Sequence, residues 1–301
     1  MGQAVRFAEI DTATAKTLTA PEAIAYHYDN DTAFFSLWLD PTLSYSCARF
    51  KDPLTGTAIA KTLADAQREK IRHHLDAVGL PKGGRLIDIG SGWGAVLFEA
   101  VRRDPDATAL GLTLSNDQHA HVNGANVPGV RCELRDVFAF ESDTLFDGAV
   151  SIGAFEHFAR PEMDRAAKLH VYGQFFARIA DLLPPGGRFS LQTIVWGGVD
   201  PARAKTLLPE TVFPQSDLPF IEEIVMASAQ TFHLAYLEND PDEYADTLSA
   251  WIKALRAERG RIEADWSPEQ YAFFERYLRR SRLSFNKRYT SLARLVLQKR
   301  G

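Results

Sequence analysis

An acid and an imidazole stand next to each other in this sequence, at Glu156 and His157, directly after an apolar run that is typical of a buried strand. A carboxylate and a histidine in that place can take up a proton or stabilise positive charge on a reactant. Structural roles are the alternative, since an acid at a helix start is stabilised by the helix dipole and a buried histidine can brace its neighbour. Of the two residues, Glu156 is the stronger candidate for chemistry.

A glycine-rich turn, Gly90-Ser91-Gly92-Trp93-Gly94, follows an apolar strand that carries Asp88 near its end. In open parallel sheets, ligands bind beyond the carboxyl ends of the strands, and glycines let the backbone approach them closely. The next strand ends in Thr113-Leu114-Ser115 and lacks the acid that binds the ribose 2′-OH in nicotinamide dinucleotide sites. The turn predicts a different ligand, with a purely structural turn as the alternative.

The elements that would position these residues alternate along the chain. Apolar periodicity predicts a strand at 85–89, a helix at 95–103, a strand at 108–112, a helix at 116–122, strands at 130–134 and 146–152, a helix at 168–183 and a strand at 187–193. Such alternation is typical of an α/β fold with a parallel sheet and helices on both faces.

Other segments flank this core. Helical spacing predicts an N-terminal helical cap at 12–38 and a helix at 58–78, which ends before Gly79. Four prolines between 199 and 220 predict a lid or pocket-lining insertion. We expect helices at 221–231, 242–258 and 267–283, and an added strand at 292–298.

Composition narrows the class of protein. The 301 residues are 46% hydrophobic, enough for one large α/β domain with additions. The net charge of −5 disfavours nucleic-acid binding over the whole molecule. Cys47 and Cys132 have neither metal-ligand nor disulfide-framework spacing, and we see no signal peptide or apolar run of membrane-spanning length. We expect a soluble cytoplasmic protein without a metal site.

Four segments together resemble the cyclopropane fatty acid and mycolic acid cyclopropane synthase family of S-adenosylmethionine (SAM)-dependent methyltransferases. They are residues 43–50, 86–94, 111–118 and 151–158, and the resemblance runs from about Tyr26 to the C-terminus. It implies a class I methyltransferase: a doubly wound, mostly parallel seven-stranded sheet with a helical cap and a helical insertion. Residues 1–301 would form one domain, with a cap and cofactor cover at 1–80, a cofactor-binding core at 81–195, an acceptor pocket at 196–285 and the last strand at 286–301.

The resemblance also implies how SAM is bound. Tyr45 and Ser46 would contact the carboxylate end, and Asp136 with Val137 would flank the adenine. The complete set of implied cofactor residues is Tyr45, Ser46, Asp88, Gly90, Ser91, Gly92, Gly94, Thr113, Leu114, Gln118, Asp136 and Val137. Ser91 stands where the family usually has cysteine, a small polar replacement that should leave binding intact.

In the family, a bound bicarbonate takes up a proton during the reaction, held by a glutamate, a histidine, a tyrosine and two backbone amides. The matching positions here are Glu156, Tyr244 and the amides of Ile152 and Cys47. The histidine is replaced by Gln192, which can donate a hydrogen bond to an anion but cannot relay a proton. Bicarbonate is therefore a less secure expectation than SAM. For Cys47 the resemblance favours a positional role over a covalent one.

The expected reaction is C-methylation or cyclopropanation of an unsaturated lipid or specialised small molecule through a carbocation-like intermediate. Arg49, which replaces the family's usual aromatic residue, and Gln192 both depart from lipid-type relatives, as does a long connection at 159–173. N-methylation of a small amine is the enzymatic alternative, because Glu156 and His157 could position a neutral nitrogen. A non-catalytic protein that holds SAM or an acyl chain is the alternative from another class.

Two groups of side chains suggest how the acceptor and partners bind. An acceptor pocket, or ordinary core, is expected from Trp196, Phe213, Phe220, Phe232, Tyr236 and Trp251. The region 271–301, part of which should form the last strand, has nine basic residues against Glu275 alone: Arg276, Arg279, Arg280, Arg282, Lys287, Arg288, Arg294, Lys299 and Arg300. This excess could contact an anionic membrane or a carrier protein transiently, or simply be a solvated face.

Overall fold

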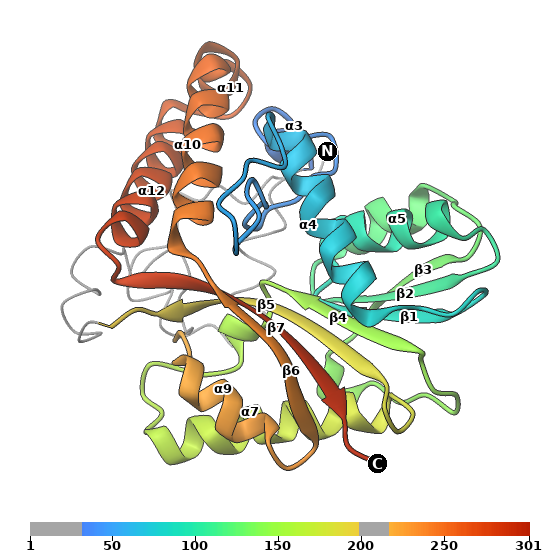
Figure 1. The fold of residues 1–301 in the computed structure, drawn as a ribbon. Coiled ribbons are helices and arrows are strands. Elements are labelled where there is room, and N and C mark those ends of the chain that lie inside the picture. Colours follow the sequence, from blue (N-terminus) through green and yellow to red (C-terminus); the bar gives the residue numbers. More distant parts are fainter. Residues whose placement is uncertain (1–31, 199–216) are drawn as a thin grey trace.

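The computed structural model describes residues 32–198 and 217–301, in which the central element is a seven-stranded sheet (Figure 1). The strand order is β3-β2-β1-β4-β5-β7-β6. The first five strands in this order pair in parallel, and β7 is antiparallel to both of its neighbours. The strands are β1 Arg85–Ile89, β2 Thr108–Thr113, β3 Val130–Leu134, β4 Gly148–Ile152, β5 Arg188–Trp196, β6 Phe232–Asn239 and β7 Thr290–Lys299.

Helices cover both faces of the sheet, which confirms the predicted doubly wound α/β fold. α4, α5 and α6 pack on one face, and α7 and α9 lie on the other (Figure 1). α10, α11 and α12 form a separate helical layer, in which α10 and α12 contact β7. The helices are α3 Thr32–Ser36, α4 Leu63–Val78, α5 Ala95–Arg103, α6 Asn116–Gly124, α7 Arg165–Asp181, α9 Ile221–Ser228, α10 Pro241–Ala257, α11 Arg259–Asp265 and α12 Pro268–Asn286, with 3₁₀ turns η2 Val137–Ala139 and η3 Phe155–His157.

Local signals explain where the helices begin and end. Thr62 caps α4 by accepting the amide of Asp65, so this helix begins at Leu63 and not at 58 as predicted. It ends at Gly79, whose φ of 62° is in the left-handed region that glycine adopts without strain. α10 and α12 each begin with proline after a capping side chain, Asp240 and Ser267 respectively.

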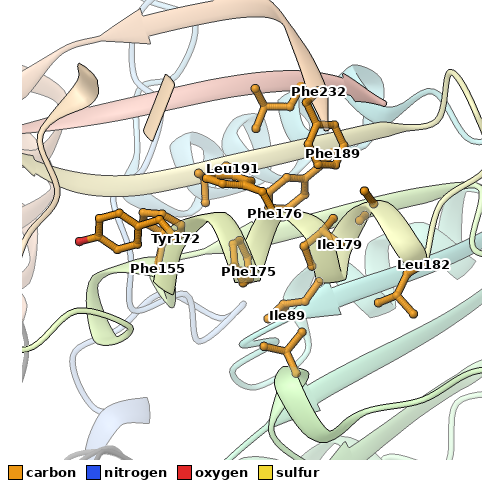
Figure 2. Packing of buried hydrophobic residues seen from close by; sticks show 14 of the residues in the cluster. Ile89, Phe155, Tyr172, Phe175, Phe176, Ile179, Leu182, Phe189, Leu191 and Phe232 are labelled. Atoms are coloured by element: carbon orange, nitrogen blue, oxygen red, sulfur yellow. The ribbon is translucent and has the colours of Figure 1, made fainter. Parts of the chain in front are cut away.

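An aromatic core lies between α7 and the sheet (Figure 2). Phe155 stacks on Tyr172 with ring centroids 4.6 Å apart, and it contacts Phe175 and Phe176 of the same helix. Burial of rings of this size dominates the local packing energy. Because Phe155 begins η3, this core fixes the short segment that carries Glu156 and His157.

A second aromatic core joins the helical layer to the N-terminal part of the described chain. Trp38, Trp251 and Phe274 are almost fully buried there together with α3. Tyr45 packs on Trp251 with centroids 5.2 Å apart. The α10–α12 layer is thereby placed against the segment that contains the predicted cofactor residues Tyr45 and Ser46.

Several element predictions were wrong. The helix predicted at 221–231 ends at Ser228, and the missed strand β6 follows it. Phe232 on that strand is 1% exposed in the core beneath the sheet, so it is not an acceptor-pocket residue. α11 was also missed. α7 begins at Arg165, capped by Asp164, so the long connection expected at 159–173 is shorter than predicted.

Some predictions fall outside the described residues. The cap at 12–38 is described only from Thr32, and most of the predicted lid, including Phe213, lies in 199–216. Within the described ranges, no helix has the length and apolar character needed to cross a bilayer.

Candidate active site

A cavity opens at the carboxyl ends of β1, β2, β3 and β4, where the sequence predicted a ligand site. Every implied cofactor residue except Gly94 lines it. Ile152 and His157, from the implied catalytic set, also contribute to its wall. The strand ends thus bring together residues from positions 45 to 157 of the chain.

The glycine turn is closely fitted to its surroundings. Gly90 has a φ of 75°, and a Cβ atom added to it would lie 2.5 Å from the Cβ of Ala154. Its amide and that of Ser91 donate to the carbonyl of Leu112, at 2.9 and 3.0 Å. Gly94 caps α5 instead of lining the cavity, and a Cβ there would meet Val122 and Phe98. The turn therefore needs glycine to approach both its neighbours and a ligand.

Two buried groups of opposite charge flank the same cavity. Asp88 is 2% exposed, its Oδ1 has no hydrogen-bond partner among the described residues, and burial raises its pKa to about 7. Lys70 of α4 is also 2% exposed, and its Nζ donates to the Ser46 hydroxyl at 2.9 Å. Burial lowers the pKa of Lys70 to about 8. The methionine part of SAM carries an ammonium and a carboxylate, which this pair matches in sign.

Sequence reasoning missed Lys70 because α4 carries several charged residues. A signal was present: Ala66, Lys70 and His74 follow one another at four-residue steps, and all three lie on the buried face of the helix. A lysine on that face needs a partner, and the cavity supplies the place for one.

Residues at the carboxyl ends of β2 and β3 form another part of the cavity wall. The Thr113 hydroxyl donates to Gln118 Oε1 at 2.7 Å, and Ser115 caps α6 by accepting the Gln118 amide. Asp136 accepts the amide of Phe138 at 2.9 Å and starts η2. These bonds hold the side chains of residues to which the resemblance gives a part in cofactor binding.

The side chains of Glu156 and His157 have different surroundings. His157 lines the cavity, and burial lowers its pKa to about 4, which keeps the imidazole neutral. Glu156 turns toward β5, where its Oε1 accepts the amide of Ile194 at 2.7 Å. Its Oε2 is buried and has no hydrogen-bond partner among the described residues. Burial raises the pKa of Glu156 to about 7.

The helical layer approaches this carboxylate. Burial raises the pKa of Tyr277 on α12 to about 12, with Tyr45 and Glu156 among the neighbouring groups that shift it. Tyr244 on α10 packs on Phe285 and Trp251, with ring centroids 4.5 and 6.1 Å apart. Tyr277 thus lies near Glu156, and Tyr244 belongs to the same aromatic cluster as Tyr277.

The Cys47 segment is held from α10. The Thr247 hydroxyl accepts the amide of Ala48 at 3.0 Å, and the Glu243 carboxylate accepts the amides of Phe50 and Lys51. Cys47 is fully buried, and burial raises the pKa of its thiol to about 12. A thiol in that state is a poor nucleophile, which agrees with a positional role for this residue.

Gln192 does not lie as the sequence suggested. Its Nε2 donates to the carbonyl of Cys47 at 3.2 Å, and its Oε1 accepts Nε of Arg294 at 2.8 Å. Both ends of the amide are therefore bonded within the protein. Arg294 was counted with the basic C-terminal excess, but it is 1% exposed and belongs to this buried group.

The same buried group contains the other departure from the family pattern. Glu238 of β6 accepts Arg294 Nη1 at 2.6 Å and Arg49 Nη2 at 3.3 Å, and it accepts the Tyr236 hydroxyl at 2.7 Å. Arg49 also bonds to His73 Nδ1 at 3.0 Å. Tyr236 is thus part of a polar network and not of an acceptor pocket.

Of the set that the family uses for bicarbonate, the corner of the histidine does not fit the anion here. The corner expected to hold it has Gln192 bonded on both sides and Arg294 paired to a carboxylate. Among the residues that the structure describes, no cluster of side chains with metal-ligand chemistry is found.

Comparison with known proteins agrees with this geometry. A family model described as mycolic acid cyclopropane synthetase matches residues 15–295. Cyclopropane mycolic acid synthase 2 of Mycobacterium bovis is 34% identical over 96% of this chain and 98% of its own length. The structure of the cyclopropane synthase MmaA2 from Mycobacterium tuberculosis superposes with a TM-score of 0.82 at 32% identity, covering 94% of this chain and 99% of that one.

A second similar structure was solved with ligands bound. It is the mycolic acid cyclopropane synthase CmaA1 complexed with SAH and CTAB, with a TM-score of 0.81, 33% identity, and coverage of 93% of this chain and 98% of that one. The matched family model, the curated relatives and the sheet with its glycine turn all lead to the same conclusion. This chain belongs to the mycolic acid cyclopropane synthetase family of SAM-dependent methyltransferases.

Proposed function

We propose that this enzyme methylates or cyclopropanates the carbon–carbon double bond of an unsaturated lipid or a related specialised small molecule. One observation carries the proposal: a buried carboxylate oxygen, Glu156 Oε2, has no hydrogen-bond partner among the described residues, beside a cofactor cavity and an aromatic helical layer. Attack by an alkene on a methyl group leaves positive charge on carbon, and a fixed carboxylate stabilises such charge. The proposal treats residues 1–301 as one methyltransferase domain.

When bound, SAM supplies an electrophilic methyl group and leaves as a neutral thioether. The residues of this chain would align it: Lys70 and Ser46 would hold the carboxylate, Asp88 the ammonium, and Gln118 with Asp136 the nucleoside. Neutral His157 in the cavity wall adds no charge that would repel the sulfonium. Alignment and exclusion of water are the main requirements for this kind of transfer.

A lipid acceptor is supported by the relatives and by the chemistry of the helical layer. Those relatives are named as mycolic acid cyclopropane synthases, and CmaA1 was solved with the alkyl surfactant CTAB. In this chain Tyr244, Trp251 and Phe285 give an apolar, aromatic surface near Tyr45. Aromatic faces stabilise cationic carbon as well as packing against acyl chains.

Contact with a membrane or an acidic acyl carrier is a further part of the proposal. Arg276, Arg280 and Lys287 are exposed on or next to α12 and form no ion pair with the described residues. Their neighbours are partly neutralised, since Arg279 pairs with Glu275 and Arg288 with Asp242. We expect the reaction to take place in the cytoplasm, with this face meeting anionic surfaces transiently.

Labelled methyl groups test the proposed function. The purified enzyme is incubated with ¹³C-methyl SAM and a fraction of unsaturated lipids, and the products are analysed by mass spectrometry and ¹³C NMR. We expect the label on a carbon of the former double bond. A label on nitrogen would replace the proposal by N-methylation of an amine. Binding of SAM without transfer to any supplied acceptor would favour a non-catalytic binder.

A further inference from the structure

The side chains of the corner around Gln192 are bonded to other groups of the protein. An amide side chain can donate and accept, and here both functions face protein groups: the Cys47 carbonyl and Arg294. Gln192 is 1% exposed, so water offers it no alternative partner. The second N–H of Nε2 could still donate to a small anion, but an amide cannot relay a proton for it.

The nitrogens of Arg294 also bond to groups of the protein. Its Nε donates to Gln192, its Nη1 to Glu238 at 2.6 Å, and its Nη2 to the Ala48 carbonyl at 2.9 Å. Its positive charge is thus paired with a carboxylate that is 7% exposed. A buried guanidinium with its nitrogens bonded and its charge paired has little free energy to gain from another anion.

Arg49 belongs to the same group of bonded side chains. It pairs with Glu238 and bonds to His73, and the pKa of His73 is lowered to about 4 by burial and then by Arg49. His73 is therefore neutral and accepts from the guanidinium. The two positions at which the sequence departs from the family, Arg49 and Gln192, are consequently joined through Glu238 and Arg294.

We propose that this enzyme works without bicarbonate and that Glu156 itself takes the proton released in the reaction. The inference rests on the proposed function and concerns how the same site completes the reaction. Arg49, Gln192, Glu238 and Arg294 act as a structural unit that positions the Cys47 segment, where the family pattern has an anion-binding corner.

Glu156 has the geometry for this role. Its Oε1 accepts the Ile194 amide, and its Oε2, which has no hydrogen-bond partner among the described residues, is left for the acceptor. The ionisable groups around it are Tyr172 of α7, Tyr277 of α12 and adjacent His157, all neutral near pH 7 because burial raises the pKa of both tyrosines and lowers that of His157. The pKa of Glu156, about 7, is near the value at which a general base is most effective in neutral solution.

The step is balanced without another reactant. After methyl transfer the acceptor carries one positive charge on carbon. A C–H bond of the transferred methyl breaks, its electron pair closes the three-membered ring, and the proton passes to Glu156 Oε2. The enzyme returns to its starting state when Glu156 gives this proton to water as the product leaves.

Binding of bicarbonate is measured first, because this needs no acceptor. ¹³C-labelled bicarbonate is titrated into the SAH-loaded enzyme and followed by ¹³C NMR line broadening, with a family member that has the histidine as positive control. We expect no saturable binding at concentrations that saturate the control. Saturable binding that is lost in Glu156→Gln would overturn the inference.

Turnover is measured next, in buffer depleted of carbon dioxide and again with added bicarbonate. The wild-type rate should not change, and Glu156→Gln should lose more than about 100-fold in either buffer while still binding SAH. Stimulation of the wild type by bicarbonate, or its rescue of Glu156→Gln, would refute the role of Glu156 as base. If no product forms from an alkene acceptor, the proposed function fails. The binding titration alone then decides whether bicarbonate binds.

Discussion

Arg294 donates from Nε to Oε1 of Gln192 at 2.8 Å, a contact between neighbouring strands β7 and β5 in the buried part of the sheet. The sequence predicted that Arg294 belongs to a basic surface and that Gln192 belongs to an anion site. The bond joins these two side chains inside the protein. Its consequence is that both side chains support the Cys47 segment. The following predictions start from this relationship and extend to the cofactor and to Glu156.

Removing the guanidinium should destabilise the fold. In Arg294→Met, Glu238 keeps only Arg49 as a charged partner and Gln192 loses its donor. Loss of one member of a buried ion pair typically costs about 3–5 kcal/mol. Urea denaturation measures this directly. The matched control is Arg276→Met on the exposed face of α12, which should change the free energy of unfolding by less than about 0.5 kcal/mol.

Lys70→Met should weaken binding of SAH but not of methylthioadenosine, which lacks the amino-acid part. A lost charge-assisted hydrogen bond is worth about 1.5–3 kcal/mol, or roughly 10- to 150-fold in affinity. Isothermal titration calorimetry with both ligands separates this effect from general damage to the cavity. Lys61→Met, at an exposed position just before α4, is the control. An equal loss for both ligands would show that Lys70 is merely structural.

The pKa of Lys70 gives the same experiment a pH dependence. Burial lowers this pKa to about 8, and a bound carboxylate favours the charged form and raises it. Binding of SAH should therefore take up protons near pH 8 and weaken at higher pH. Calorimetry in buffers of different ionisation enthalpy measures the uptake, which should be absent from Lys70→Met.

Much of the lining of the cavity could be predicted from sequence because its residues lie in short local motifs at strand ends. The Gln192 corner could not, since Arg294 is 102 positions away in sequence and its partner Glu238 lies on a strand that was missed. β6 escaped prediction because it is an edge strand: Leu234 and Leu237 are exposed, so apolar and polar residues do not alternate cleanly. Sites of this kind are formed by residues that lie far apart in the sequence, and local motifs do not reveal which of these residues pair.

Gly90→Ala should abolish SAH binding or prevent folding. The added Cβ would lie 2.5 Å from the Cβ of Ala154, and the backbone φ of 75° is strained for alanine. The control is Gly124→Ala at the end of α6, where a Cβ meets open space, and it should be neutral or slightly stabilising. Thermal unfolding with and without SAH compares the two. Normal SAH affinity in Gly90→Ala would show that the turn is looser than described.

Glu156→Gln should change the pH dependence of stability. The pKa of Glu156 in the folded state, about 7, lies above its ordinary value of 4.5, so folding favours the protonated form. Wild-type stability from this group is fully present below pH 4.5 and is lost as the pH rises through 7. The variant should therefore be more stable than the wild type at pH 8, on the order of 3 kcal/mol for a shift of this size, and the gap should close toward pH 4.5. Chemical denaturation across this range gives the comparison, and a constant gap would contradict the raised pKa.

The most direct measurement follows the ¹³C-methyl label from SAM into an unsaturated acceptor, with wild type and Glu156→Gln at saturating SAM. We predict label on a carbon of the former double bond in the wild type. The variant should lose more than about 100-fold in rate with unchanged affinity for SAH. Label on nitrogen, or a variant as active as the wild type, would contradict Glu156 as the residue that receives the charge and proton of a carbon acceptor.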